Sequence, residues 1–186
     1  MTKSKVWRWL GSVLLFAALL AAAMYLRNHQ MDTVAAHQPI DVRGSLGAEA
    51  SGRNVTGEVI AVHRTQSLSV PTGRRVATDG TFLVVEFEAA TLLGPGPIQV
   101  DLEVDGTTHT ALDVPGGYER ERVNPGIRLR GTAVFEIPTA AANGDAQFRI
   151  TGSNDPRLDS RLVFEIALAD APNENVVDVI PTMVAS

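Results

Sequence analysis

The chain has 186 residues, enough for one domain and an additional segment, and it contains no cysteine. The absence of cysteine excludes disulfides and a lipid-attachment cysteine. From residue 28 onward the chain carries 12 arginines and 21 acidic residues, a formal charge of −9. This charge argues against nucleic acid as a partner, because an acidic surface gains nothing from a phosphate backbone.

Residues 10–26, LGSVLLFAALLAAAMYL, contain no charged side chain. Together with Trp7 and Trp9 the run is about 20 residues long, the length of a helix that crosses a hydrocarbon core. Three basic residues precede the run and only Arg27 follows it closely, a bias that places the N-terminus in the cytoplasm. We therefore predict a cytoplasmic N-terminus over 1–8 and a transmembrane signal-anchor helix over 9–26.

This anchor would make the protein a single-pass protein of the cell membrane, with its remaining residues outside the cytoplasm. A cleaved signal peptide is the alternative, because the alanines at 21–23 resemble a cleavage site after Ala23. The run exceeds the ~7–15 apolar residues of a signal peptide, which favours the uncleaved anchor.

Residues 27–53 are polar and rich in small side chains, which is typical of a flexible stalk. From residue 54 onward, alternating apolar and polar runs are separated by turn residues. Seven runs are expected as strands: 55–63, 81–87, 98–104, 107–112, 132–137, 146–150 and 161–168. About seven or eight short strands predict an all-β domain over 54–170, an antiparallel immunoglobulin-like β-sandwich. The tail 171–186 is either a disordered end or an added edge strand.

The run IQVDLEV, residues 98–104, alternates most regularly, with Leu102 and Val104 among the side chains expected to face inward. Asp105 and Gly106 follow it. This pair favours a two-residue type I′ turn, whose central residues both need a positive φ. Residues 107–112 are therefore expected to return antiparallel.

The stretch VNPGIRLRGTAVFEIP, residues 123–138, joins a turn to an apolar strand. Pro125 and Gly126 suit the two central positions of a type II turn. Gly131 is expected to mark a bulge or a close approach of another segment. Pro138 ends the strand because it has no N–H to donate.

Three stretches together resemble the telokin-like, immunoglobulin-like extracellular domains of unknown function on bacterial membrane-anchored proteins: TDGTFLVVEFEA (78–89), LEVDGTTHT (102–110) and NPGIRLRGTAVFEIP (124–138). DPRLDSRLVFEIAL (155–168) is similar to the closing strand of an actinobacterial branch. The resemblance covers about residues 54–169 and implies a sandwich outside the cytoplasm without established catalytic residues. The chain departs from the family pattern at 89–91, where AAT stands in place of an asparagine.

The sequence predicts no enzyme and no cofactor. It has no G-x-S-x-G nucleophile elbow, no H-E-x-x-H zinc pattern and no phosphate-binding loop. His63 and His109 lie on predicted strands among polar neighbours and are expected at the surface. An envelope-polymer hydrolase is one alternative, and it would need two facing carboxylates such as Asp155 and Asp159.

A calcium- or carbohydrate-binding module is the other alternative. Asn154, Asp155 and Asp159 could converge in one turn and offer the oxygen ligands that Ca²⁺ prefers. The alternating carboxylates of Asp101 and Glu103 are expected to form a solvated sheet face instead.

A surface that binds another protein is the preferred reading. Its candidate residues are the outward-facing Arg128 and Arg130, together with Tyr118 in the charged stretch GYERER, for which a half-buried position on a strand is the favoured alternative. We predict a non-catalytic accessory subunit that binds another envelope or membrane protein, for example a transporter, through loops or sheet edges.

Overall fold

The computed structural model describes residues 15–16, 18–25, 38–118, 122–153 and 159–185. The chain divides into two compact units, Met1–Gln38 and Pro39–Ser186. In the first unit residues 18–25 are helical. No helix within the described ranges is both long and apolar enough to cross a membrane. The anchor expected over 9–26 falls partly outside those ranges and stays a prediction.

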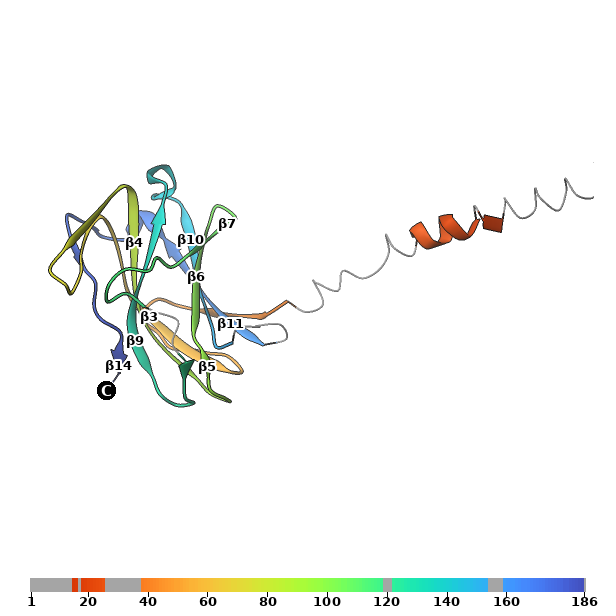
Figure 1. Ribbon diagram of the computed structural model, residues 1–186, viewed down its shortest axis with the longest axis horizontal. Coiled ribbons are helices and arrows are strands. Elements are labelled where there is room, and N and C mark those ends of the chain that lie inside the picture. The colour runs from red at the N-terminus through yellow and green to blue at the C-terminus, as the bar shows by residue number, and fades with distance from the viewer. Residues whose placement is uncertain (1–14, 17, 26–37, 119–121, 154–158, 186) are drawn as a thin grey trace, which may run out of the picture. The chain divides into compact units, whose positions relative to one another are not determined.

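The second unit is a β-sandwich of two facing sheets (Figure 1). One sheet has the strand order β1-β11-β10-β6-β7, with the bounds Ile40–Gly44, Ser160–Ala167, Asp145–Thr151, Gln99–Val104 and Thr107–Thr110. The other has the order β12-β3-β4-β9-β14, with the bounds Asn173–Glu174, Val55–Ser69, Arg75–Thr91, Leu129–Ile137 and Met183–Val184.

Shorter elements complete the unit. β2 and β13 pair with β3, and β5 pairs with β8, over Ala50–Ser51, Val177–Asp178, Gly96–Pro97 and Arg122–Val123. Two 3₁₀ turns, η2 and η3, span Thr139–Ala141 and Leu168–Asp170.

The predicted β-sandwich is confirmed, and each of the seven expected strands is present. The central pairings are antiparallel, as expected. The exceptions involve both ends of the chain: β1 runs parallel to β11, and β12 and β13 run parallel to β3. These parallel strands lie far from their partners in sequence, because parallel neighbours need long connections.

The stalk expected over 27–53 is too long, because β1 and β2 lie within it and the sandwich unit begins at Pro39. In β1 the half-buried Val42 packs against the core, while Asp41 and Arg43 make ion pairs. The tail 171–186 contributes the short strands β12, β13 and β14, so its strand alternative is the one observed.

Two turns have the expected geometry. Asp105 and Gly106 both have positive φ, 49° and 74°, and β7 returns antiparallel to β6. Gly126 has a φ of 80°, and the N–H of Ile127 donates to the carbonyl of Asn124 at 3.1 Å, as in a type II turn.

Gly131 marks a close approach. A Cβ at this position would lie 3.2 Å from the ring of Tyr118, so a side chain larger than hydrogen would press on that ring. The glycine that the sequence singles out therefore makes room for a buried tyrosine.

The main core lies between the two sheets and is built around aromatic rings. Phe148 of β10 lies 5.6 Å from Phe87 of β4 and 6.0 Å from Phe135 of β9, measured between ring centroids. All three side chains are fully buried. Because Phe148 belongs to one sheet and the other two rings to the second, these contacts join the sheets.

A second, smaller core covers the outer side of the larger sheet. Phe82 and Val84 of β4 and Val134 of β9 pack there against Val177 and Val179 of the tail. These β4 residues alternate with Leu83 and Val85 of the main core, so β4 is buried on both faces.

Candidate functional site

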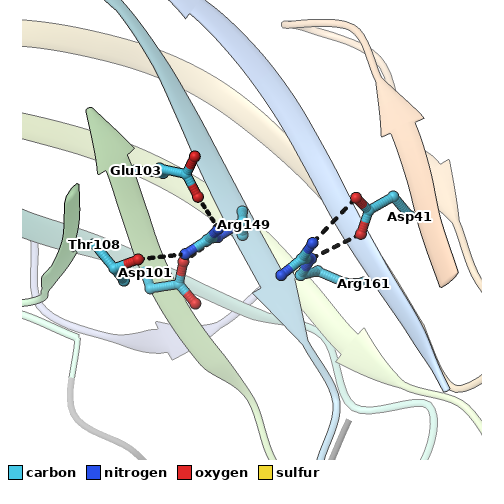
Figure 2. Close-up of polar contacts among 6 residues, drawn as sticks. All are labelled: Asp41, Asp101, Glu103, Thr108, Arg149 and Arg161. Carbon is cyan, nitrogen blue, oxygen red and sulfur yellow. Dashed lines mark hydrogen bonds and ion pairs between the residues drawn. The ribbon is translucent and has the colours of Figure 1, made fainter. Parts of the chain in front are cut away.

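The outer face of the five-stranded sheet carries a network of charges centred on Arg149 (Figure 2). Arg149 lies on β10, and its side chain is only 9% exposed. It forms ion pairs with Asp101 and Glu103 of the neighbouring β6. Its Nη2 also donates to the hydroxyl of Thr108 on β7 at 3.0 Å. One guanidinium therefore connects three strands.

A second pair extends this network toward β1. Arg161 of β11 binds Asp41 through two bonds, Nε to Oδ1 at 2.8 Å and Nη2 to Oδ2 at 3.0 Å (Figure 2). Because the Asp41 carboxylate accepts these bonds, the pKa of the Arg161 guanidinium is raised above its ordinary value. Arg43 and Glu165 form a third pair at 3.0 Å.

These pairs satisfy one another and leave little chemistry available on this face. Asp101 and Glu103, expected as a solvated sheet face, both pair with Arg149. Arginine–carboxylate pairs fix geometry. The network therefore ties the strands of this sheet together.

Replacing Arg149 with leucine should lower the free energy of unfolding by about 2–3 kcal/mol, because it leaves two carboxylates without their charged donor. The estimate lies below the value for a fully buried pair since Asp101 and Glu103 are 31% and 36% exposed. Urea denaturation of the full chain measures it. Arg43→Leu is the matched control, since both members of its pair are largely exposed and it should cost less than about 1 kcal/mol.

Arg128 and Arg130, predicted as part of a partner surface, lie in a second chain of ion pairs. Arg130 Nε donates to Glu86 at 2.7 Å, and Arg128 lies 3.6 Å from Glu88 and also pairs with Glu49. Both arginines remain partly exposed. Their role in binding stays a prediction, but a partner would meet charges that are already compensated.

The Glu49–Arg128 pair predicts a pH dependence. The hydrogen bond from Arg128 lowers the pKa of Glu49 below its ordinary value of 4.5. The pair's stabilisation is therefore present above the unfolded-state pKa and is lost as the pH falls through the lower folded-state pKa. Urea midpoints of the wild type and Glu49→Gln should differ at pH 6 and converge toward pH 3. A difference that persists unchanged at pH 3 would contradict this.

Tyr118 is buried, so its candidate role in a partner surface is wrong and the alternative of a buried tyrosine is the one observed. Its side chain is buried, its hydroxyl donates to the carbonyl of Ile98 at 2.7 Å, and its ring meets Phe87 edge-on at 5.0 Å. The segment that carries it leaves β7 and follows the edge of β9, where the Tyr118 N–H donates to the carbonyl of Thr132. This crossing brings the tyrosine into the core although charged residues follow it directly in sequence.

Of the three calcium candidates, one lies among the described residues. Asn154 and Asp155 lie outside the described residues. Asp159 is described, and its Oδ1 accepts the N–H of Ser160 at 2.8 Å, which is a local turn contact. No group of three or more histidine and carboxylate side chains that could hold a metal occurs in the part of the chain that the structure describes.

One edge of β3 is partly open. β4 pairs along the full length of the other edge, but on this edge β2 covers only 56–57, β12 only 64–65 and β13 only 68–69. Residues 58–63 have no strand neighbour there among the described residues. A β-bulge between Val59 and Ala61 interrupts the register at this point.

A groove of about 390 Å³ runs beside this open edge. It is lined by Leu46, by residues 59–62 of β3, and by 165–167 and 170–172 from β11 and the following turn. Most of these side chains are apolar, and Glu165 and Asp170 are the carboxylates among them. Ile60 and Leu46 are exposed, at 36% and 48%. The groove therefore combines apolar side chains with strand backbone.

Backbone bonds are made at both limits of the open stretch. The Val59 carbonyl accepts from the N–H of Gly47 at 2.9 Å, and the N–H of Arg64 donates to the carbonyl of Pro172 at 2.8 Å. Val62 lies two residues before Arg64, so alternation along the strand turns its backbone groups the same way as those of Arg64. An extended segment bound along 60–63 would therefore lie between Val59 and Arg64, whose backbone groups are already hydrogen-bonded.

A polar pocket of about 370 Å³ lies farther along the unit. Its lining is mostly amides and hydroxyls, including Gln66, Thr81, Asn143, Asn173 and Asn175. Arg64 at its wall donates to the carbonyls of Ala142, Ala169 and Ala171.

No family model matches the chain, and no curated protein matches it. An uncharacterized β-sandwich protein from Clostridium difficile 630 is similar in structure, with a TM-score of 0.47 and 7% identity over 69% of this chain and 96% of that chain. A conserved hypothetical protein from Bacillus anthracis has a TM-score of 0.46 and 14% identity over 62% of this chain and 93% of that chain. The telokin-like resemblance is not among these findings and stays a prediction.

Proposed function

We propose that this protein is a non-catalytic binding module outside the cytoplasm, which captures an extended segment of another envelope or membrane protein along the open edge of β3. The observation that carries this proposal is the strand edge at 58–63, which lacks a strand neighbour among the described residues and borders an apolar groove. Added strands bind through main-chain hydrogen bonds, and side-chain pockets beside the edge supply specificity.

The distribution of charged side chains supports a non-catalytic role. Arg149, Arg161 and Arg130 are bound to carboxylates on sheet faces, and these pairs do not converge on the groove. His63 Nδ1 lies 2.6 Å from Glu174, which gives this histidine a local partner. Four carboxylates, of Glu103, Asp105, Asp145 and Glu165, do line one cavity of about 560 Å³. Two of them, Glu103 and Glu165, are paired with Arg149 and Arg43, as charges that stabilise a sheet face would be.

The predicted anchor over 9–26 would hold this module at the membrane. The acidic balance of the chain beyond it and the absence of cysteine fit an exported module that depends on its own core. An accessory subunit beside a membrane protein is the role that joins these features.

Crosslinking in native membranes tests the proposal with the full chain carrying an affinity tag. The wild type should yield a discrete adduct with a second protein, and Ile60→Lys should lose it, because a lysine on a strand edge opposes strand addition. Thr72→Lys is the control, since Thr72 is exposed in the turn between β3 and β4 and lies outside the groove. An adduct retained equally by both variants, or monomer alone from the wild type, would contradict the proposal.

The polar pocket supports a second candidate function, carbohydrate binding. Amide and hydroxyl groups such as those of Asn143, Asn173 and Thr81 suit the hydroxyls of a sugar. A soluble envelope oligosaccharide should then raise the melting temperature of the wild type and not that of Asn173→Leu. Equal melting curves with and without the sugar would exclude that ligand.

A further inference from the structure

Exposed apolar side chains gather at one end of the sandwich. Eight large apolar side chains are exposed among the described residues from 39 onward, and two of them, Leu46 and Ile60, belong to the groove. The other six lie where β1 and β3 begin and β4 ends, and they define the proximal end: Ile40, Leu92, Leu93, Ile127, Met183 and Val184.

Backbone hydrogen bonds hold the central part of this end together. The N–H groups of Leu92 and Leu93 donate to the carbonyl and the side-chain oxygen of Asn54, at 3.0 and 2.9 Å. The N–H of Gly126 donates to the carbonyl of Thr91 at 2.9 Å. The loop that exposes the two leucines is therefore fixed against the turn that exposes the neighbouring isoleucine.

The remaining residues join this centre from both sides. β14 pairs with the first residues of β9, directly after the turn at 124–127. On the other side the N–H of Ile40 donates to the carbonyl of Asp159, and the N–H of Arg53 donates to Ser160 Oγ. In Figure 1 the loops around β5 and the strand β14 lie at the bottom of the sandwich.

Charge distinguishes this end from the opposite one. Loops 91–98 and 122–128 contain Arg122 and Arg128 and no acidic residue. The opposite, distal end exposes four aspartates: Asp79 in β4, Asp105 in the turn between β6 and β7, Asp145 at the start of β10 and Asp170 in η3. These two loops suit a bilayer surface because they carry no carboxylate, and carboxylates are repelled by anionic lipids. Asp159, beside Ile40, and Glu49, paired with Arg128, lie at their margin.

The path of the chain points to the same surface. The sandwich unit begins at Pro39, next to Ile40 of the proximal end. Twelve residues, 27–38, separate it from the predicted anchor. Twelve extended residues span at most about 43 Å, so the proximal end stays within reach of the membrane that holds the anchor.

We propose that the proximal end docks on the lipid bilayer, with Leu92 and Leu93 inserted at the level of the headgroups. This inference rests on the membrane attachment in the proposed function. It would orient the module so that the groove beside β3 is presented at a defined height above the membrane.

The absence of cysteine permits a direct test. An environment-sensitive fluorophore is placed on a single cysteine, Pro95→Cys at the proximal end or Thr72→Cys in the distal turn, in the full chain reconstituted into phosphatidylethanolamine–phosphatidylglycerol vesicles. The label at 95 should shift to shorter wavelength and lose intensity to a lipid-borne quencher. The label at 72 should respond only to an aqueous quencher. Adding Leu92→Ser and Leu93→Ser should remove the lipid response at 95.

Each other outcome overturns the proposal in a distinguishable way. If the chain floats with the vesicles but the labels at 95 and 72 respond alike, the docking is wrong and the membrane attachment stands. If the lipid response at 95 survives the two serine substitutions, the leucines do not insert. If the chain does not float with the vesicles, both the attachment and the docking are wrong.

Discussion

Replacing Phe148 with alanine should lower the free energy of unfolding by about 3–5 kcal/mol, since it removes a fully buried ring and leaves a cavity. Phe148 is the ring of β10 that contacts both Phe87 and Phe135 of the opposite sheet. Its loss therefore weakens the contact between the sheets and not only one strand. Urea denaturation followed by far-ultraviolet circular dichroism measures the change.

Leu93→Ala is the control for this substitution. Leu93 is 67% exposed, so its truncation should change the free energy of unfolding by less than about 0.5 kcal/mol. If Phe148→Ala cost no more than Leu93→Ala, the two sheets would not share the aromatic core described above.

Deleting residues 176–186 should lower the free energy of unfolding by roughly 3–5 kcal/mol, because full burial of each valine side chain is worth about 1.5–3 kcal/mol. The deletion removes the buried Val177 and Val179, which cover Phe82 and Val84 on the outer side of the larger sheet. It should also expose enough apolar surface to increase binding of a hydrophobic dye.

A shorter deletion tests whether the loss of stability comes from the buried valines or from shortening the chain alone. Removing 183–186 takes away β14, whose Met183 and Val184 are exposed, and should cost much less than the longer deletion. Equal costs for the two deletions would show that the second core does not depend on the valines of the tail.

Much of the sandwich could be predicted because its central strands alternate. Residues 98–104 show why: Leu102 and Val104 are buried as expected, and the Asp105–Gly106 turn returns the chain. β1 was missed, and the strands of the tail were expected only as an alternative to a disordered end, for a physical reason. β1, β12 and β13 are short and pair in parallel with segments that are distant in sequence. The alternation of residues within a short segment does not indicate a partner strand so far away.

Alternation of apolar and polar residues also fails to predict strands and buried positions where pairing with other segments decides the structure. β3 and β4 extend to a turn at 70–74, although 64–80 has no regular alternation. Long-range pairing compensates there for a weak local preference. Tyr118 was misplaced for a similar reason, since only the crossing from β7 to the edge of β9 brings it into the core.

One feature of the sequence indicated the unusual edge of β3 beside the groove. In VTGEVIAVH, residues 55–63, Ile60 and Val62 are apolar on the side of the strand that should be polar. The structure explains this break, because a bulge reverses the alternation after Val59. The other wall of the groove comes from 165–167 and 170–172 and could not be deduced from the sequence of β3.

A photo-crosslinking amino acid at position 60 gives the most direct measurement of partner binding. Light should join the chain in native membranes to one second protein when the probe replaces Ile60. It should give no such adduct when the probe replaces Thr72, which is exposed in the distal turn. The same adduct from both positions, or from neither, would contradict binding along the open edge of β3.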